Sequence, residues 1–248
     1  MRTANPALNA NTFKSLDYAS GQTEAMTLQG TVNKTGVLLF LTMISAVWVW
    51  NLFFSSSDPA VVMPWVAVGV IGGFVLGLVT AFKKNWAAVT APLYAVTEGL
   101  ALGGISSVFE MQFPGIVIEA VALTFGTLLC LLVAYKSGLI RPSENFKLGV
   151  VSATGAIAFF YFVTFILGFF GVKMSFFYGN SLLSIAISVV IVIIAALNLV
   201  LDFDFIEGGA ASGAPKYMEW YSAFGLLVTL VWLYIEILRL LAKLRSRE

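Results

Sequence analysis

The chain of 248 residues contains no histidine, one cysteine and few charged side chains. Without imidazole, Ser-His-Asp hydrolysis, zinc sites of the HExxH type, histidine-ligated haem and histidine proton relays are excluded. The single cysteine, Cys130, excludes an intrachain disulfide and a multi-thiolate metal site. Most enzyme chemistry therefore lacks its usual residues, and we expect a protein that is not an enzyme and holds no cofactor.

Charged residues are also scarce: they make up only 11% of the chain, whereas 59% of the residues are hydrophobic. A soluble domain carries roughly a quarter charged residues, so this composition predicts an integral membrane protein whose main partner is the lipid bilayer. The balance of 14 Lys+Arg against 13 Asp+Glu gives a net charge of +1. That charge provides no basic field for nucleic acid, so nucleic acid is not an expected partner.

Seven apolar stretches each approach the ~20 residues that a hydrocarbon core requires. In lipid the backbone must satisfy its own hydrogen bonds, so each stretch is expected to be a helix. The predicted fold is all-α and integral to the membrane, with a seven-helix domain over residues 34–248 and a polar cytoplasmic tail over residues 1–33. The stretches are Thr35–Phe54, Val61–Phe82, Trp86–Phe109, Gly115–Tyr135, Leu148–Val172, Asn180–Leu201 and Trp220–Leu241.

Lysine and arginine are distributed unevenly among the joints between these stretches. The first and third joints carry none and the fifth carries only Lys173, whereas the tail and the even-numbered joints carry Arg2, Lys14, Lys34, Lys83, Lys84, Lys136, Arg141, Lys147 and Lys216. The positive-inside rule therefore places the N-terminus in the cytoplasm. Seven spans then place the C-terminus outside, although it carries Arg239, Lys243, Arg245 and Arg247. That basic cluster leaves the side of the C-terminus open.

Small residues recur at helical spacing within three stretches. They predict faces on which helix backbones approach closely, which is how helices pack where lipid offers no hydrophobic contrast. These residues are Gly69, Gly73 and Gly77 in the second stretch, Gly99 and Gly103 in the third, and Ser184 and Ser188 in the sixth.

Acidic residues inside apolar stretches are functional candidates, because a charge near the bilayer centre costs about 2.5–3.5 kcal/mol on insertion scales. Glu98 lies midway along the third stretch, and Glu236 lies within the last. Arg239 follows Glu236 by three residues, so the two side chains can pair along the helix. Such a pair would have a structural role only, because it would hold the helix in position. Glu119 lies one turn inside the fourth stretch, where it fits an acid at a helix start.

The sixth stretch ends in NLVLDFDFIEGG, where Asp202 and Asp204 interrupt a long apolar run. Asn198 and Asp202 are four residues apart and share one helix face, while Asp204 points elsewhere. One interpretation is that these acids mark the point where the helix leaves the membrane. The other is that they line a cavity. Two carboxylates that share a proton act as a coupled switch, and ionised carboxylates suit a hard cation such as calcium.

The motifs YAVTEGLALGGISSVFE, LNLVLDFDFIEGG and PKYMEWYSAFGLLVTLVWLYIEILRLLAKL together resemble the transmembrane Bax inhibitor motif family, in its bacterial YccA-like branch. The resemblance implies six helices around a central seventh, and a pH-sensitive calcium leak in a bacterial inner membrane. It also implies a hydrogen-bonded pair of acids that senses protons and gates the pore, here Asp202 or Asp204 with Glu236. The basic residue that pairs with them falls on Lys83 or Lys84.

Two features of the chain depart from that pattern. The family has aspartate in the last helix, and glutamate is one methylene longer. Two helices that simply cross the bilayer would also place Glu236 roughly 20 Å deeper than Asp202, at 1.5 Å per residue. The pair forms if the last helix starts well outside the membrane or the joint folds back, and otherwise Glu236 would meet Glu98 or Arg239.

The sequence thus predicts a cation leak gated by Asp202 or Asp204 with Glu236, the same carboxylates serving as calcium ligands when ionised. The supporting polar residues are Glu98, Asn198, Arg239, Lys83 and Lys84. A second hypothesis from another class is a regulatory protein that binds a membrane-bound protease through its tail, as the resemblance also implies. A retinal receptor is disfavoured because the last stretch has no lysine before Lys243, and an aspartyl protease is disfavoured because neither acid lies in a GxGD motif.

Overall fold

The computed structural model describes residues 25–56, 58–171, 179 and 181–247. Within that part of the chain, seven long helices are each long and apolar enough to cross a membrane, which confirms the predicted all-α membrane fold. They are α2 (Leu28–Ser56), α3 (Pro59–Phe82), α4 (Ala87–Gln112), α5 (Ile116–Lys136), α6 (Glu144–Phe169), α8 (Leu182–Ala211) and α9 (Met218–Arg245), and a short 3-10 turn, η1 (Lys84–Trp86), precedes α4.

Local sequence explains where several helices begin. The side chains of Asp58, Ser143 and Ser181 accept hydrogen bonds from backbone N–H groups in the first turns of α3, α6 and α8. Such caps satisfy donors that have no partner within the helix. Before α5 the chain turns at Gly115, whose φ of 84° is a left-handed conformation that favours glycine. The Glu110 carboxylate then accepts from the backbone N–H groups of Gly115 and Val117.

Helix α8 is longer than its apolar run predicts. The sequence placed the end of the sixth stretch at Leu201, but α8 continues to Ala211, about 15 Å further along the axis. Asp202 and Asp204 therefore lie within the helix, nine and seven residues before its end. At the other end of the chain, α2 begins at Leu28, so the last residues of the predicted tail are helical. Residues 1–24 of that tail lie outside the described residues.

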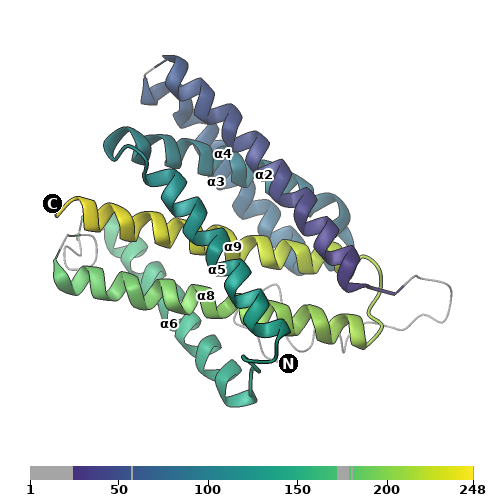
Figure 1. Ribbon diagram of the computed structural model, residues 1–248. Helices are drawn as coiled ribbons and strands as arrows, with labels where there is room; N and C mark the ends of the chain where they lie inside the picture. The colour runs from purple at the N-terminus through teal and green to yellow at the C-terminus, as the bar shows by residue number, and fades with distance from the viewer. Residues whose placement is uncertain (1–24, 57, 172–178, 180, 248) are drawn as a thin grey trace.

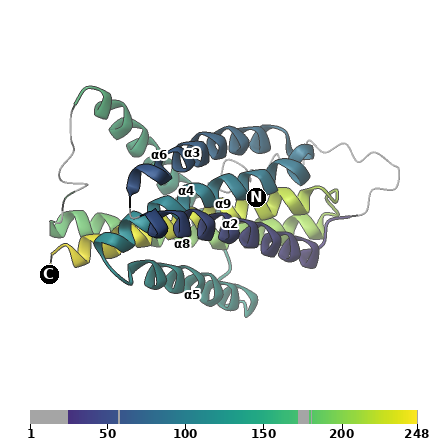
Figure 2. The same cartoon turned by 90° about the horizontal axis from the view of Figure 1, so that it is seen from above.

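Helix α9 lies inside the bundle, with α2, α4, α5 and α8 packed against it (Figure 1). In its most apolar 18 residues, 61% are buried, whereas the corresponding share in α6 is 11%. A helix buried on most sides belongs to the interior, and a helix buried on one narrow face is exposed to lipid. Figure 2 shows the C-terminal end of α6 standing away from the other helices. This arrangement is consistent with peripheral helices around a central seventh.

The joints that carry lysines meet at one end of the bundle, which we call the lysine-rich end. Lys34 contacts the start of α9, the Nζ of Lys84 lies 5.9 Å from the ring centre of Tyr221, and Lys147 reaches α8. The seven spans therefore place the start of α2 and the even-numbered joints on one side, as the charge pattern predicted.

The basic residues at the opposite end of α9 are bound to protein groups. Arg239 lies 3.3 Å from a Glu236 oxygen, and Lys243 donates to the Ser188 hydroxyl at 2.8 Å. Arg245 donates to the Pro114 carbonyl at 2.7 Å and to Glu119 at 2.6 Å. Three of the four cations at this end of the chain thus bind protein groups.

The predicted small-residue faces are confirmed where α4 meets α2 and α3. A Cβ added at Gly103 would lie 2.4 Å from the Ala46 carbonyl oxygen, and one added at Gly69 would lie 2.5 Å from the Ala101 nitrogen. These distances are too short for any side chain, so the glycines allow backbone contact between helices. By contrast, nothing lies within 4 Å of a Cβ added at Gly126 on α5.

We predict that Gly103→Ala forces α2 and α4 apart and destabilises the protein by roughly 1–3 kcal/mol, the usual cost of overpacking. Gly126→Ala is the matched control, and it should be neutral or stabilise by up to about 1 kcal/mol because helical glycine is entropically unfavourable. Thermal unfolding of both variants in detergent measures the difference. Equal shifts in Tm would contradict the close contact.

A clasp at the lysine-rich end joins the segment before α2 to the turn between α8 and α9. The backbone N–H of Met26 donates to the Ala214 carbonyl at 2.7 Å. The completely buried carboxylate of Glu219 accepts from the backbone and hydroxyl of Thr27, both at 2.9 Å, and pairs with Lys34. Lys216 lies 3.4 Å from the same carboxylate. These contacts satisfy a charge that would otherwise be costly to bury.

We predict that Glu219→Gln lowers the free energy of unfolding by roughly 2–4 kcal/mol, because it leaves the Lys34 ammonium without its buried counter-charge. The control is Glu119→Gln, which removes a half-exposed partner of Arg245 and should cost less than about 1 kcal/mol. Unfolding of both variants would be followed in the same detergent, and a cost for Glu119→Gln as large as that for Glu219→Gln would refute the clasp.

Candidate functional site: a polar seam between α8 and α9

Polar residues follow one face of α9 at intervals of seven. Ser222, Thr229 and Glu236 are buried, with 0%, 3% and 2% of their surfaces exposed, and Lys243 is half-buried. Steps of seven residues return to nearly the same face of a helix. Helix α9 therefore carries a continuous polar stripe through the apolar interior.

Helix α8 faces this stripe with Ser188, Ala195 and Asp202, which also follow one another in steps of seven and are buried. The bond from Lys243 to Ser188 shows that this face of α8 is turned toward the stripe. We call the two facing rows, Ser188, Ala195 and Asp202 with Ser222, Thr229, Glu236 and Lys243, the polar seam.

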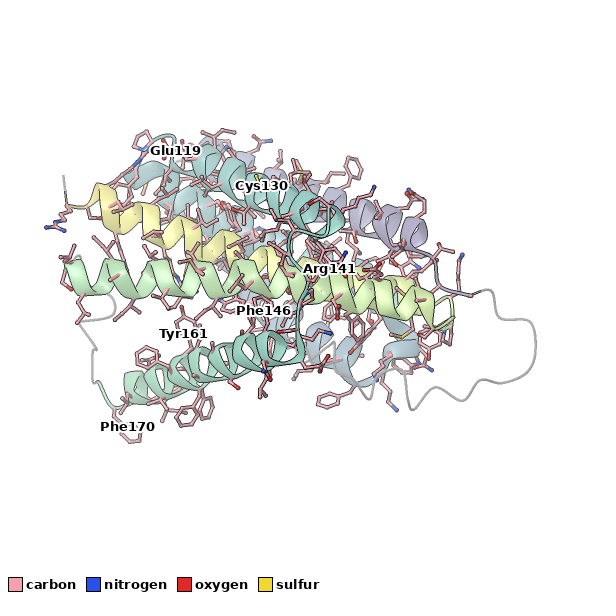
Figure 3. The ribbon with its side chains drawn as sticks, turned by 60° about the horizontal axis from the view of Figure 1, so that its bottom comes forward. Glu119, Cys130, Arg141, Phe146, Tyr161 and Phe170 are labelled. Carbon is pink, nitrogen blue, oxygen red and sulfur yellow. The ribbon has the colours of Figure 1, made fainter. Side chains whose placement is uncertain are left out.

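Glu236 lies in the half of the seam that is farther from the lysine-rich end, and two partners hold it. The hydroxyl of Tyr161 on α6 donates to its carboxylate at 2.7 Å, and Arg239 donates at 3.3 Å. The Arg239 guanidinium also lies 5.8 Å from the centre of the Tyr161 ring. Figure 3 shows Tyr161 on the side of α6 that faces α8. The predicted pairing of Glu236 with Arg239 is thus present, joined by a tyrosine that the sequence did not indicate.

Asp202 is completely buried and lies at a different depth from Glu236. The helices are antiparallel, and Lys243 meets Ser188 after similar counts from the connecting turn, so counts from that turn give depth. Asp202 lies nine residues before the end of α8, and Glu236 lies 18 residues after the start of α9. The difference is about 14 Å along the axis. The two carboxylates therefore do not form the predicted pair in this packing, and the longer α8 reduces the expected mismatch without removing it.

Asp204 and Asn198 point from α8 toward α6. An Asp204 oxygen lies 2.8 Å from the Lys147 ammonium, which also approaches Glu144 at 3.2 Å. The Asn198 amide donates to the Thr154 hydroxyl at 2.8 Å. Both contacts join α6 to α8, so Asp204 serves an ion pair at the lysine-rich half of the helix. This arrangement favours Asp202 over Asp204 as the acid of the seam.

The remaining predicted site residues lie away from the seam. Glu98 on α4 faces α3, where one of its oxygens would be 2.9 Å from a Cβ added at Gly73. The hydroxyl of Tyr94, one turn earlier, lies beside its carboxylate. Lys84 lies against the ring of Tyr221 near the start of α9, far along that helix from Glu236. Glu98 and Lys84, like the neighbouring Lys83, are thus not brought to the acids of the seam.

Five residues that hold this region together were missed by sequence reasoning. Their signal was present for Ser222 and Thr229, because both precede Glu236 by multiples of seven. It was absent for Lys147 and Tyr161, whose partners are distant in the chain. The fifth is Glu219, which directly precedes the predicted stretch Trp220–Leu241 and therefore has the position of an ordinary acid at a helix start.

The hydroxyl and carboxylate oxygens of the seam lie at several depths along α8 and α9 and do not converge on one point. Among the described residues, no three acidic or sulfur side chains come close enough to hold a metal ion together. The predicted set of Asp202, Asp204 and Glu236 therefore does not converge on a calcium ion in this packing. Such an arrangement can pass a hard cation or a proton between single carboxylates, which differs from storing an ion in a fixed cage.

We predict from this geometry that Tyr161→Phe and Glu236→Gln are coupled by about 1–3 kcal/mol, the cost of leaving a buried polar group without its hydrogen bond. Asp202→Asn and Glu236→Gln should instead be additive within about 0.5 kcal/mol, because the two carboxyls lie apart. Double-mutant cycles of unfolding in detergent measure both terms. Strong coupling between Asp202 and Glu236 would show that the pair forms after all.

Comparison with known proteins gives one match. A family model described as "Bax inhibitor 1 like" matches residues 5–246, nearly the whole chain. No curated protein and no solved structure matches the chain.

Proposed function

Because the chain belongs to the Bax inhibitor 1 like family, we propose that it is a pH-sensitive cation leak whose ions, calcium among them, pass along the polar seam. The family membership shows a membrane protein, and the proposal specifies the path of the ions and the residue that gates it. It places the gate at Asp202 and gives Glu236 a separate position on the same path.

The observation that carries the proposal is the complete burial of Asp202 on the face of α8 that meets the central helix. Burying a protonated carboxyl group costs less free energy than burying an ionised one, so close packing of α8 against α9 is compatible with the protonated acid. Ionisation favours entry of water into the seam and separation of the two helices. Alkaline conditions should therefore open the path, and acidic conditions should close it.

The order of side chains along the seam supports a cation as the permeant species. A cation would meet Glu236 in one half of the membrane and Asp202 in the other, with hydroxyls such as that of Thr229 between them. Oxygen ligands suit calcium, and several weak sites in series permit ions to leave as well as enter. The ammonium groups of Lys34 and Lys147 bind Glu219 and Asp204, so these lysines do not place a positive charge in the seam.

The charge pattern supports an orientation for this path. The lysine-rich end gathers the N-terminal side of α2 and the even-numbered joints, so the positive-inside rule assigns it to the cytoplasm. The proposed location is a bacterial inner membrane, with the Glu236 half of the seam toward the outside.

We predict that calcium flux into liposomes containing the purified protein rises several-fold between about pH 6 and about pH 8. Asp202→Asn should remove this pH dependence, because an amide cannot ionise. Glu236→Gln should lower flux at every pH, because it removes a ligand from the path. Asp204→Asn should retain the pH dependence, since Lys147 already binds that acid.

Glu207→Gln is the matched control, because Glu207 lies on the same helix but accepts from Tyr135 at the exposed surface. It should behave as the native chain does. Flux no higher than in empty liposomes under all conditions would overturn the channel proposal.

The second candidate is a regulatory protein that binds a membrane-bound protease. The clasp favours it specifically, because Glu219 connects the base of the N-terminal tail to the central helix. For this candidate, deletion of residues 1–24 should abolish co-purification with the protease and leave unfolding unchanged. Asp202→Asn should have no effect on that association.

A further inference from the structure

Two buried hydroxyls near the start of α9 have no hydrogen-bond partner among the described residues: those of Tyr221 and Ser222. Both side chains are completely buried. A buried hydroxyl without a protein partner loses its hydrogen bonds with bulk water, and in native proteins such groups are commonly satisfied by ordered water. The other seam hydroxyl of α9 differs, because Thr229 donates to the Gly225 carbonyl one turn earlier at 3.3 Å.

The hydroxyl of Ser222 lies on the face of α9 that belongs to the polar seam, between the clasp and Asp202. Glu219 precedes it by three residues, which places the two side chains on neighbouring positions of the helix surface. Ser222 lies four residues after Met218, the first residue of α9. Asp202 lies nine residues before the end of α8, which corresponds to a depth of about nine residues along α9. The axial gap is about 7–8 Å, which two water molecules span with three hydrogen bonds of about 2.7–2.8 Å.

Gly225 lies between Ser222 and that level on the stripe side of α9. It contributes no side chain to the stripe in this interval. The clasp at the other end of the interval leads to solvent, because the side chain of Lys216 is 42% exposed while it contacts Glu219.

Several protonatable side chains on the neighbouring helices bind acids other than Asp202. Lys34 binds Glu219, and Lys147 binds Asp204. Tyr135 donates to Glu207 and Tyr161 donates to Glu236. The titratable and charged groups on the elements packed against α8 are Lys34 of α2; Glu119, Cys130, Tyr135 and Lys136 of α5; Glu144, Lys147 and Tyr161 of α6; and Glu219, Tyr221, Tyr234, Glu236, Arg239, Lys243 and Arg245 of α9.

From these observations we infer that Ser222 holds a short file of buried water that connects Asp202 to the clasp, so that Asp202 exchanges protons with the lysine-rich side. The site binds water, and its function is to carry protons by transfer along hydrogen bonds. Ser222 is a positioning residue, because it orders the water and is not itself protonated. This inference rests on the proposed role of Asp202 as the proton-binding group, but not on ion conduction.

The first test is the thermal stability of Ser222→Ala. If water satisfies the hydroxyl, its deletion removes a hydrogen bond, and Tm should fall by about 2–4 °C. The matched control is Ser107→Ala, which deletes a buried hydroxyl that donates to the Gly103 carbonyl at 2.7 Å. Both variants should shift Tm in the same direction. A rise in Tm for Ser222→Ala would show that the hydroxyl is dry and would overturn the inference.

The second test follows the protonation of Asp202 itself by infrared difference spectroscopy after a light-induced pH jump, with the carboxyl band assigned by its loss in Asp202→Asn. Ser222→Ala should slow protonation of Asp202 at least tenfold. Ser107→Ala should leave the rate within about twofold, because Ser107 lies on α4 and its hydroxyl donates to the Gly103 carbonyl.

An unchanged rate in Ser222→Ala, or an equal loss in Ser107→Ala, would overturn the inferred route. Both readouts are independent of calcium flux. A protein that shows no flux but loses fast protonation of Asp202 in Ser222→Ala would therefore contradict the proposed leak while supporting the water site.

Discussion

The structure depends on the packing of α8 against α9, because this contact buries polar and ionisable side chains in the interior of a membrane protein. Lipid offers no hydrophobic contrast to hold the two helices together, so the seam relies on close fit and on specific hydrogen bonds. The bond between Lys243 and Ser188 marks the register of the antiparallel pair. That register in turn determines that Asp202 and Glu236 lie at different depths.

Charges are distributed so that each end of α9 is tied to its surroundings while the middle stays neutral or protonatable. Glu219 binds the start of α2 at one end, and Arg245 binds the joint before α5 at the other. Between them, Glu236 is held by Tyr161 and Arg239, and Asp202 is enclosed by the packing of α8 and α9. Helix α9 is therefore anchored to other parts of the chain at both of its ends.

The candidate site was predicted only in part. Asp202 and Glu236 were recognisable because a charge within an apolar stretch is expensive wherever the stretch packs. Their expected pairing was not formed, because pairing depends on the length of α8, and an apolar run does not show how far a helix continues after its last hydrophobic residue. Tyr161 and Lys147 were missed for another reason: α6 reaches the seam from a distant part of the chain, and their own sequence surroundings carry no sign of it.

By itself, the sequence determined the membrane fold and the seven spans, because hydropathy and helix length act locally on each segment. It also determined the glycine faces, since helical spacing alone brings Gly99 and Gly103 to one side. Only the tertiary structure decided which carboxylates meet which donors and at what depth. Those contacts depend on helix register and crossing, which arise from the packing of side chains on several helices at once.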